Sequence, residues 1–163
     1  MTVIELMANV LEGNLGMLTG TLADFSDADL LVRPVPAANH AAWQLGHLIK
    51  SEAGALGLIN PALAPALPAG FADKFTKQTA SIDDPSQFPK KAALIDTLTN
   101  VRSATVAWVK TLTPADLEKP SPERFRSWAP TLGHYVLMVP GHLAMHVGQL
   151  QVIRRKLGKP ILF

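Results

Sequence analysis

Apolar residues recur at every third or fourth position over long stretches of this sequence, and nearly all of its prolines fall at or between the ends of those stretches. Such spacing places apolar side chains on one face of a helix, whereas no stretch shows the strict alternation expected of a strand. The pattern predicts four main helices, over residues 2–24, 39–60, 89–111 and 130–157. We therefore expect an all-α protein built as a four-helix bundle.

Residues that commonly begin helices stand at the predicted boundaries. Thr2 and Glu5 have the spacing of a capping box at the start of the first helix. Asn39 follows a proline-rich break and is the expected N-cap of the second helix. Thr113 precedes Pro114, which suits the first position of a helix, so the last break should contain one short helical turn.

Two proline-bearing segments interrupt this helical pattern. Residues 61–89 contain five prolines and no sustained period, which predicts a long connection. Connections of this length are unusual inside a compact domain, and this one would suit a crossover between two helical pairs. Pro140 lies inside the last predicted helix, where it should kink the chain two residues before His142.

The two halves of the chain are similar at an offset of 87 residues. The triplet Ala-Asp-Leu occurs at 28–30 and again at 115–117, and Leu-Gly-His occurs at 45–47 and at 132–134. We interpret this as two similar helical hairpins packed about a pseudo-twofold axis. Shared chemistry at helix entries is the alternative explanation.

Length and composition favour one folded domain over residues 1–163. Apolar residues make up 48% of the chain and charged residues 17%, so enough surface can be buried to offset the entropy of folding. The net charge is only +2. The basic residues near the C-terminus suit a helix end, so we expect no binding to nucleic acid.

The sequence also constrains location and metal chemistry. No stretch reaches about 18 uncharged apolar residues, and the acidic Glu5 and Glu12 do not fit a secretory signal. We therefore expect no membrane span and a cytoplasmic protein. Because there are no cysteines, any metal ion must be held by histidine or carboxylate.

His142 and His146 are four residues apart, a spacing that leaves both rings on one helix face, about 40° apart and roughly 6 Å along the axis. The best third ligand is His47, which lies within an apolar run of the second helix; a core histidine bonded to a backbone carbonyl is the alternative. His134 is about 12 Å from His142 along a straight helix, so joint ligation is not expected. His40 is too far from His47 to share an ion and should be exposed near the helix start or line a pocket mouth.

Two further side chains are candidates for contacts with a cofactor or ligand. Trp43 lies one turn before His47 and would form a wall of the site, although an aromatic at this spacing is also typical of a core. Gln149 follows His146 by three residues and could orient a ligand or a histidine ring, with a simple interhelical hydrogen bond as the alternative.

Three other residues near the histidines have weaker expectations. Glu52 lies about 140° around the helix from His47 and should face away from the site, although a carboxylate ligand remains possible. Gly46 and Gly148 lack side chains beside the ligands and would let the second and last helices approach closely. Ordinary tolerance of glycine is the alternative.

Two histidine motifs are similar to those of a known family. The second predicted helix carries W-x-x-x-H from Trp43 to His47, and the last carries H-x-x-x-H-x-G-Q-L from His142 to Leu150. In these elements the sequence resembles the DinB-like, or DinB/YfiT-like, superfamily of metalloenzymes. The resemblance extends loosely over the whole chain, since the proline breaks and the long middle connection also fit.

The resemblance implies a four-helix bundle of the DinB/YfiT type, often a homodimer. It also implies that His47, His142 and His146 bind a divalent metal ion, nickel, zinc or a similar ion, as an open facial triad. Family members include transferases and isomerases that use low-molecular-weight thiols such as bacillithiol, mycothiol or glutathione.

We therefore predict a metal-dependent enzyme, a thiol transferase or a hydrolase that acts on a small molecule. The alternative is a non-catalytic metal-binding or stress-associated helical bundle. No nucleophile and no clear general base accompanies the three histidines in the sequence, so the catalytic residues are not identified. A DNA-binding module is disfavoured by the weak charge.

Overall fold

Four long helices make up the protein, whose computed structural model describes residues 1–162. They are α1 (Val3–Leu22), α2 (Ala41–Ile59), α3 (Lys91–Lys110) and α5 (Leu132–Lys156), with the single-turn α4 (Pro114–Leu117) before the last. Within the described residues there is no strand, only one isolated bridge between Pro120 and Thr131. The predicted all-α four-helix bundle is confirmed.

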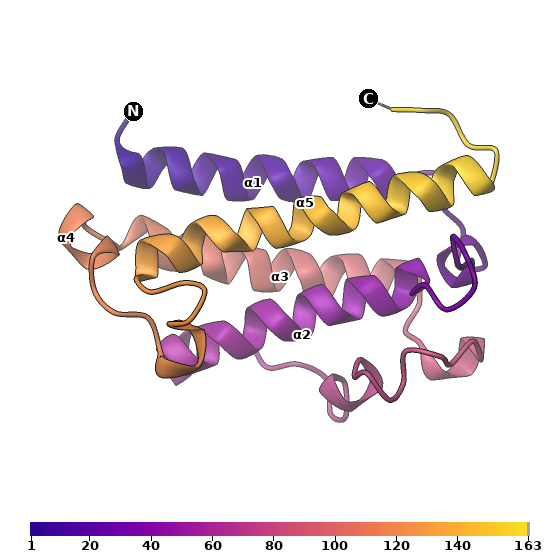
Figure 1. Ribbon diagram of the computed structural model, residues 1–163, viewed down its shortest axis with the longest axis horizontal. Coiled ribbons are helices and arrows are strands. Elements are labelled where there is room, and N and C mark those ends of the chain that lie inside the picture. The colour runs from indigo at the N-terminus through magenta and orange to yellow at the C-terminus, as the bar shows by residue number, and fades with distance from the viewer. Residues whose placement is uncertain (163) are drawn as a thin grey trace.

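The order of the helices around the bundle differs from a chain of hairpins (Figure 1). α1 packs against α5 and α3, while α2 packs against α3 and α5. The guanidinium of Arg154, near the end of α5, donates to the carbonyl oxygen of Thr21, near the end of α1, at 2.8 Å. α1 and α5 are therefore parallel neighbours, and α1 and α2 lie diagonally across the bundle. The predicted pair of helical hairpins is wrong.

The internal similarity holds at the two Ala-Asp-Leu turns. Ser26 and Asp29 exchange hydrogen bonds between side chain and backbone, and Thr113 and Asp116 do the same before α4. The Leu-Gly-His triplets are not equivalent, because residues 45–47 lie in the second turn of α2 whereas residues 132–134 begin α5. The similarity between the two halves is therefore explained by shared capping residues at these two turns, the alternative given above.

The helix starts follow the sequence with one exception. The capping box of Thr2 and Glu5 is present, as is the short turn after Thr113. The N-cap of α2, however, is His40 and not Asn39. The Nδ1 of His40 accepts a hydrogen bond from the backbone of Trp43 at 3.1 Å, and its Nε2 lies 3.1 Å from the carbonyl oxygen of Ile82. His40 is completely buried, so its expected exposure is wrong.

The predicted long connection joins the end of α2 to the start of α3 and contains three single-turn 3₁₀ helices, Pro61–Leu63, Ala72–Lys74 and Pro85–Gln87. Its aromatic side chains anchor it, since Phe71, Phe75 and Phe88 are buried in the core. A Cβ added at Gly46 would lie 2.1 Å from the ring of Phe75. The missing side chain of Gly46 therefore makes room for Phe75 of the long connection and not for α5. Gly148 borders open space. The expectation that these two glycines let α2 and α5 approach closely is therefore wrong.

α5 is continuous through Pro140. By length and composition alone it could cross a membrane, and among the described helices no other meets that test. Core helices of soluble proteins pass the same test, and α5 packs between α1 and α2. This is weak evidence for a membrane span.

A buried ion pair ties three helices together at the middle of the bundle. Arg102 of α3 donates to both carboxylate oxygens of Glu52 of α2, at 2.8 and 2.9 Å. It also donates to the backbone oxygen of Leu11 in α1 at 2.9 Å, and Thr105 donates to Glu52 at 2.6 Å. Such a pair is costly to disrupt, because removal of one partner leaves the other charge buried and uncompensated.

We predict that Arg102→Met lowers the free energy of unfolding by roughly 3–5 kcal/mol, because Glu52 then lacks its cation. Denaturation by guanidinium chloride measures the change. The double variant Arg102→Met, Glu52→Leu is the control and should recover much of the loss, since it removes both charges. A loss below about 1 kcal/mol in the single variant would contradict the assignment.

Candidate metal centre

Three histidines from α2 and α5 meet at one point. The candidate ligand atoms of His47, His142 and His146 all lie within 4.8 Å of one another. The Nε2 atoms of His47 and His142 are 3.3 Å apart. Two imidazoles bound at 2.0–2.1 Å to a tetrahedral ion have nitrogens about 3.3–3.4 Å apart. The spacing of this donor pair therefore fits a single divalent ion.

The packing of α2 against α5 brings these rings together. The two helices are antiparallel, because His47 contacts His142 while Gln44, one turn earlier in α2, contacts His146, one turn later in α5. The ring centroids of His142 and His146 are 4.9 Å apart, as expected for residues one turn apart on one face. The sequence motif places two ligands, and the helix contact supplies the third.

Gln44 fixes the protonation of His146, a role that the sequence did not reveal. The side-chain nitrogen of Gln44 donates to the backbone oxygen of Asn39 at 2.8 Å. Its amide oxygen therefore faces Nδ1 of His146, 3.0 Å away, and that nitrogen must carry the proton. The Nε2 lone pair of His146 is then free to bind a metal, and the hydrogen bond also holds the ring in place.

Gln149, the glutamine expected to orient a ring or ligand, is exposed on the surface of α5. The glutamine that contacts a histidine of the triad is Gln44, which is buried. Its position three residues before His47, and so one turn away on the same helix, was the only signal in the sequence.

Trp43, one turn before His47, packs directly on a ring of the triad. Its ring stacks on the imidazole of His47 with a centroid distance of 5.1 Å and an angle of 6°. Its indole nitrogen donates to the backbone oxygen of Thr76, in the long connection, at 3.2 Å. The connection thus fixes Trp43, and Trp43 fixes the plane of His47. Contact between Trp43 and a cofactor stays a prediction.

The other two histidines stand apart from the triad. His134 is exposed in the first turn of α5, and its Nδ1 lies 2.9 Å from the hydroxyl of Thr131, the N-cap of that helix. His40 is the buried N-cap of α2. Neither residue is part of the histidine cluster; both make contacts at helix starts, and His40 also contacts Ile82 in the long connection.

Burial keeps the triad neutral. It is the main cause that lowers the pKa of His47 to about 4, with the charge of His142 as a second cause. Burial likewise lowers the pKa of His146 to about 4, and the pKa of His142 is also below its usual value for this reason. At neutral pH all three imidazoles are therefore unprotonated at one nitrogen, the form that binds metal ions.

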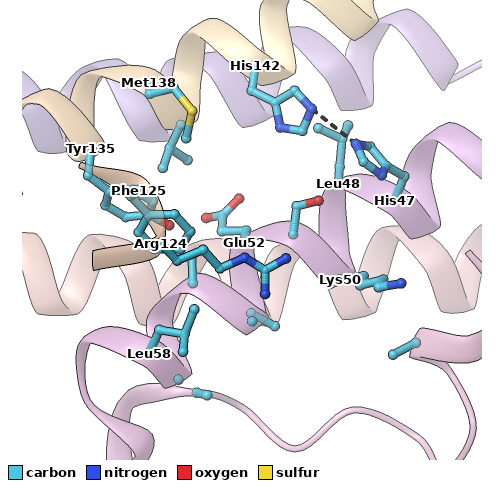
Figure 2. A pocket seen from close by; sticks show the side chains of 18 of the residues that line it. His47, Leu48, Lys50, Glu52, Leu58, Arg124, Phe125, Tyr135, Met138 and His142 are labelled. Atoms are coloured by element: carbon cyan, nitrogen blue, oxygen red, sulfur yellow. Dashed lines mark hydrogen bonds between the residues drawn. The ribbon is translucent and has the colours of Figure 1, made fainter. Parts of the chain in front are cut away.

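A cavity of about 1170 Å³ adjoins the triad, with His47 and His142 in its wall (Figure 2). Ligand pockets commonly have volumes of about 300–1,000 Å³, so it is large enough for a small molecule. Its wall is mainly apolar and includes Leu48, Ala55, Leu58, Phe125, Trp128, Met138, Val139 and Met145. The cavity gives a small molecule access to the histidines.

A few polar side chains interrupt this apolar wall. Glu52 was expected to face away from the site, but it lines the cavity while its carboxylate pairs with Arg102. It is not part of the histidine cluster. Tyr135 also lines the cavity, together with the cationic Lys50 and Arg124 (Figure 2). Ser51 is a further residue of this wall.

An all-helical bundle in which three neutral histidines converge beside a cavity defines a candidate metal-binding helical protein. The family model of the DinB superfamily matches residues 11–150. The chain therefore belongs to the DinB superfamily, which confirms the resemblance of its two histidine motifs. None of the curated proteins is significantly similar to it in sequence.

Two solved structures share the fold. A conserved protein from Enterococcus faecalis has a TM-score of 0.72 and 19% identity, over 98% of this chain and 99% of that chain. YfiT from Bacillus subtilis has a TM-score of 0.69 and 16% identity, over 98% of this chain and 91% of that chain. YfiT is described as a probable metal-dependent hydrolase with an unusual four-helix bundle topology. At these identities the likeness shows the fold alone.

We predict that Gln44→Leu weakens binding of a divalent ion about 10- to 100-fold, because His146 loses the acceptor that fixes its proton and its orientation. Isothermal titration of metal-free protein with zinc measures the affinity. Gln149→Leu is the matched control, since it removes an exposed glutamine from α5, and its affinity should equal that of the unmodified protein. Equal affinities for all three proteins would show that Gln44 does not support the site.

Proposed function

We propose that this protein is a metal-dependent enzyme that binds one divalent ion with His47, His142 and His146. Its reaction would be hydrolysis of a small molecule or transfer of a low-molecular-weight thiol to it. The observation that carries the proposal is the convergence of three neutral histidines, two of which, His47 and His142, lie in the wall of a cavity of about 1170 Å³.

The chain's own residues would hold the ion and position the substrate. Trp43 and Gln44 restrain the rings of His47 and His146, and the apolar wall would orient a small molecule and exclude water around it. A divalent ion held in this way supplies a Lewis acid that lowers the pKa of a bound water or thiol. Because the chain has no cysteine, any thiol that takes part in the reaction would have to come from an added small molecule.

The number of ligands favours catalysis over the non-catalytic alternative. Structural zinc sites are normally closed by four protein ligands, whereas catalytic sites keep a position for water or substrate. Among the described residues only three metal-ligand groups meet at this point, and Glu52 is paired elsewhere. The description of YfiT as a probable metal-dependent hydrolase supports hydrolysis, and the family's thiol-dependent members support transfer.

We expect protein purified without an affinity tag or added metal to contain close to one equivalent of a divalent ion, measured by elemental analysis. His142→Ala should lose most of it, because two imidazoles hold a divalent ion weakly. His134→Ala is the matched control, since it removes an exposed histidine from the same helix, and should retain the ion. Equal metal content in the two variants would contradict the site.

Cobalt-substituted protein can be used to distinguish thiol transfer from hydrolysis. Titration with glutathione or another low-molecular-weight thiol, followed in the absorption spectrum of the cobalt, reports whether a thiol reaches the ion. A new charge-transfer band would support thiol transfer. An unchanged spectrum would count against it and leave hydrolysis.

We also propose that the protein forms a homodimer through the outer face of α5. Leu137, Met145 and Val152 are 58%, 56% and 47% exposed, and they lie within about 80° of one another around the helix. Exposed apolar patches often mark interfaces, and the family resemblance makes a second copy the expected partner.

Light scattering should give twice the chain mass of 17.5 kDa. Replacement of Leu137 and Val152 by glutamate should shift the protein to monomer, because both charges would be buried in the interface and neither residue lines the cavity. A wild-type protein that is monomeric at high concentration would exclude the dimer.

A further inference from the structure

Arg124 lines the cavity with a guanidinium group that no other part of the protein engages. Among residues 1–162, its side chain forms neither an ion pair nor a hydrogen bond. Arg33, Arg102 and Arg154, by contrast, each pair with a carboxylate. A guanidinium left without a partner in a cavity wall indicates a binding point for an anion, because its planar donors match the two oxygens of a carboxylate.

The loop that carries Arg124 is fixed against the bundle. Its two ends are joined by the bridge between Pro120 and Thr131. The next residue, Phe125, is buried and stacks on Tyr135 of α5 with a centroid distance of 5.4 Å and an angle of 17°. The backbone of Arg124 therefore has a defined position, and its side chain extends toward the residues of α2 that line the cavity (Figure 2).

The cavity wall carries more positive than negative charge. Lys50 is a second cation in this wall, one turn after His47 on α2. Among the described residues, Glu52 is the only acidic side chain that lines the cavity, and Arg102 pairs with both of its carboxylate oxygens. A carboxylate group that enters the cavity would therefore meet two cations and no unopposed negative charge.

Of the two cations, Arg124 has more donors available to a ligand. The ammonium of Lys50 donates to the backbone oxygen of Phe75 at 3.3 Å, so the long connection already holds it. Arg124 is exposed, and all five of its N–H donors are accessible to a molecule in the cavity. Water weakens the attraction of an exposed cation for an anion, but an apolar molecule that fills the cavity would displace some of that water and strengthen it.

Arg124 lies away from the histidines, toward the first turns of α5. Its neighbour Phe125 packs on Tyr135, which precedes His142 by two helical turns, about 10 Å along the helix. Met138, which lies between them in the sequence, is one of the apolar residues of the wall. The cavity therefore has the histidines at one end, Arg124 about two turns away, and apolar surface between them.

We propose that Arg124 is a substrate-binding residue, and that the substrate is a largely apolar molecule with a carboxylate at the end remote from its reacting group. The guanidinium would bind both carboxylate oxygens, while the apolar wall covers the body of the molecule. This substrate class rests on the proposed function, which places the reacting group beside the histidines. The preference for a carboxylate at Arg124 does not depend on the metal.

A matched pair of probes tests this preference. Both are derived from suberic acid and carry a metal-binding hydroxamate at one end, but the other end is a carboxylate in one probe and an uncharged carboxamide in the other. Isothermal titration of zinc-loaded protein measures the two affinities. We expect the carboxylate probe to bind about 5- to 10-fold more tightly, the effect of a charged hydrogen-bonded pair that is partly exposed to water. Added sodium chloride should reduce this ratio.

Arg124→Gln should reduce the ratio to below about twofold and change the affinity for the carboxamide probe by less than about twofold. Its melting temperature should equal that of the wild type, since Arg124 has no partner to lose. Arg155→Gln is the matched control, because it removes an exposed arginine that does not line the cavity, and it should keep the wild-type ratio. A ratio that is the same in wild type and Arg124→Gln would overturn the proposal, since another group would then bind the carboxylate.

The same titrations in metal-free protein separate this inference from the proposed function. Both probes should bind more weakly there, but the carboxylate probe should keep its advantage in the wild type and lose it in Arg124→Gln. If zinc has no effect on either affinity while the ratio persists, the metal-dependent function fails and the role of Arg124 stands. If zinc tightens binding of both probes and neither is preferred, the role of Arg124 fails and the metal site stands.

Discussion

The contact between α2 and α5 is the interaction on which the candidate site depends. It joins side chains 95 residues apart at His47 and His142, and 102 residues apart at Gln44 and His146. No single helix carries the whole site. Because the two helices are antiparallel, one turn back along α2, from His47 to Gln44, matches one turn forward along α5, from His142 to His146. A shift of either helix along its axis would separate ligands and also remove the hydrogen bond that sets the proton of His146.

The unusual course of the chain makes the long connection part of the site. α2 and α3 are parallel neighbours, so the chain must return along the length of the bundle between them (Figure 1). That return path carries Phe75, which packs on Gly46, and Thr76, whose backbone accepts from Trp43. The connection thus holds the helix turn that precedes His47. A simple up-and-down bundle with short loops would lack this support.

Local chemistry made much of the fold predictable. The apolar period and the caps at Thr2 and Thr113 are short-range features, so the four helices and the short turn could be read from the sequence. The order of the helices around the bundle is a long-range property, and the hairpin interpretation failed for that reason. His40 was also misjudged, because its capping role depends on a carbonyl oxygen of Ile82, 42 residues away.

The site itself was predictable only in part. The spacing of His142 and His146 places two rings on one face, but the choice of His47 rested on the family resemblance as well as on its apolar surroundings. Gln44 and Gln149 could not be ranked from sequence, because which glutamine meets a ring depends on how α2 and α5 pack.

The electrostatics of the cavity follow from these contacts. The histidines are neutral, and the charge of Glu52 is balanced by Arg102, so the interior of the wall carries little net charge. The cations Lys50 and Arg124 line the cavity without a free carboxylate to oppose them. An ion in the triad would therefore be the largest local charge. Negative charge that develops on a substrate would therefore be favoured beside the histidines.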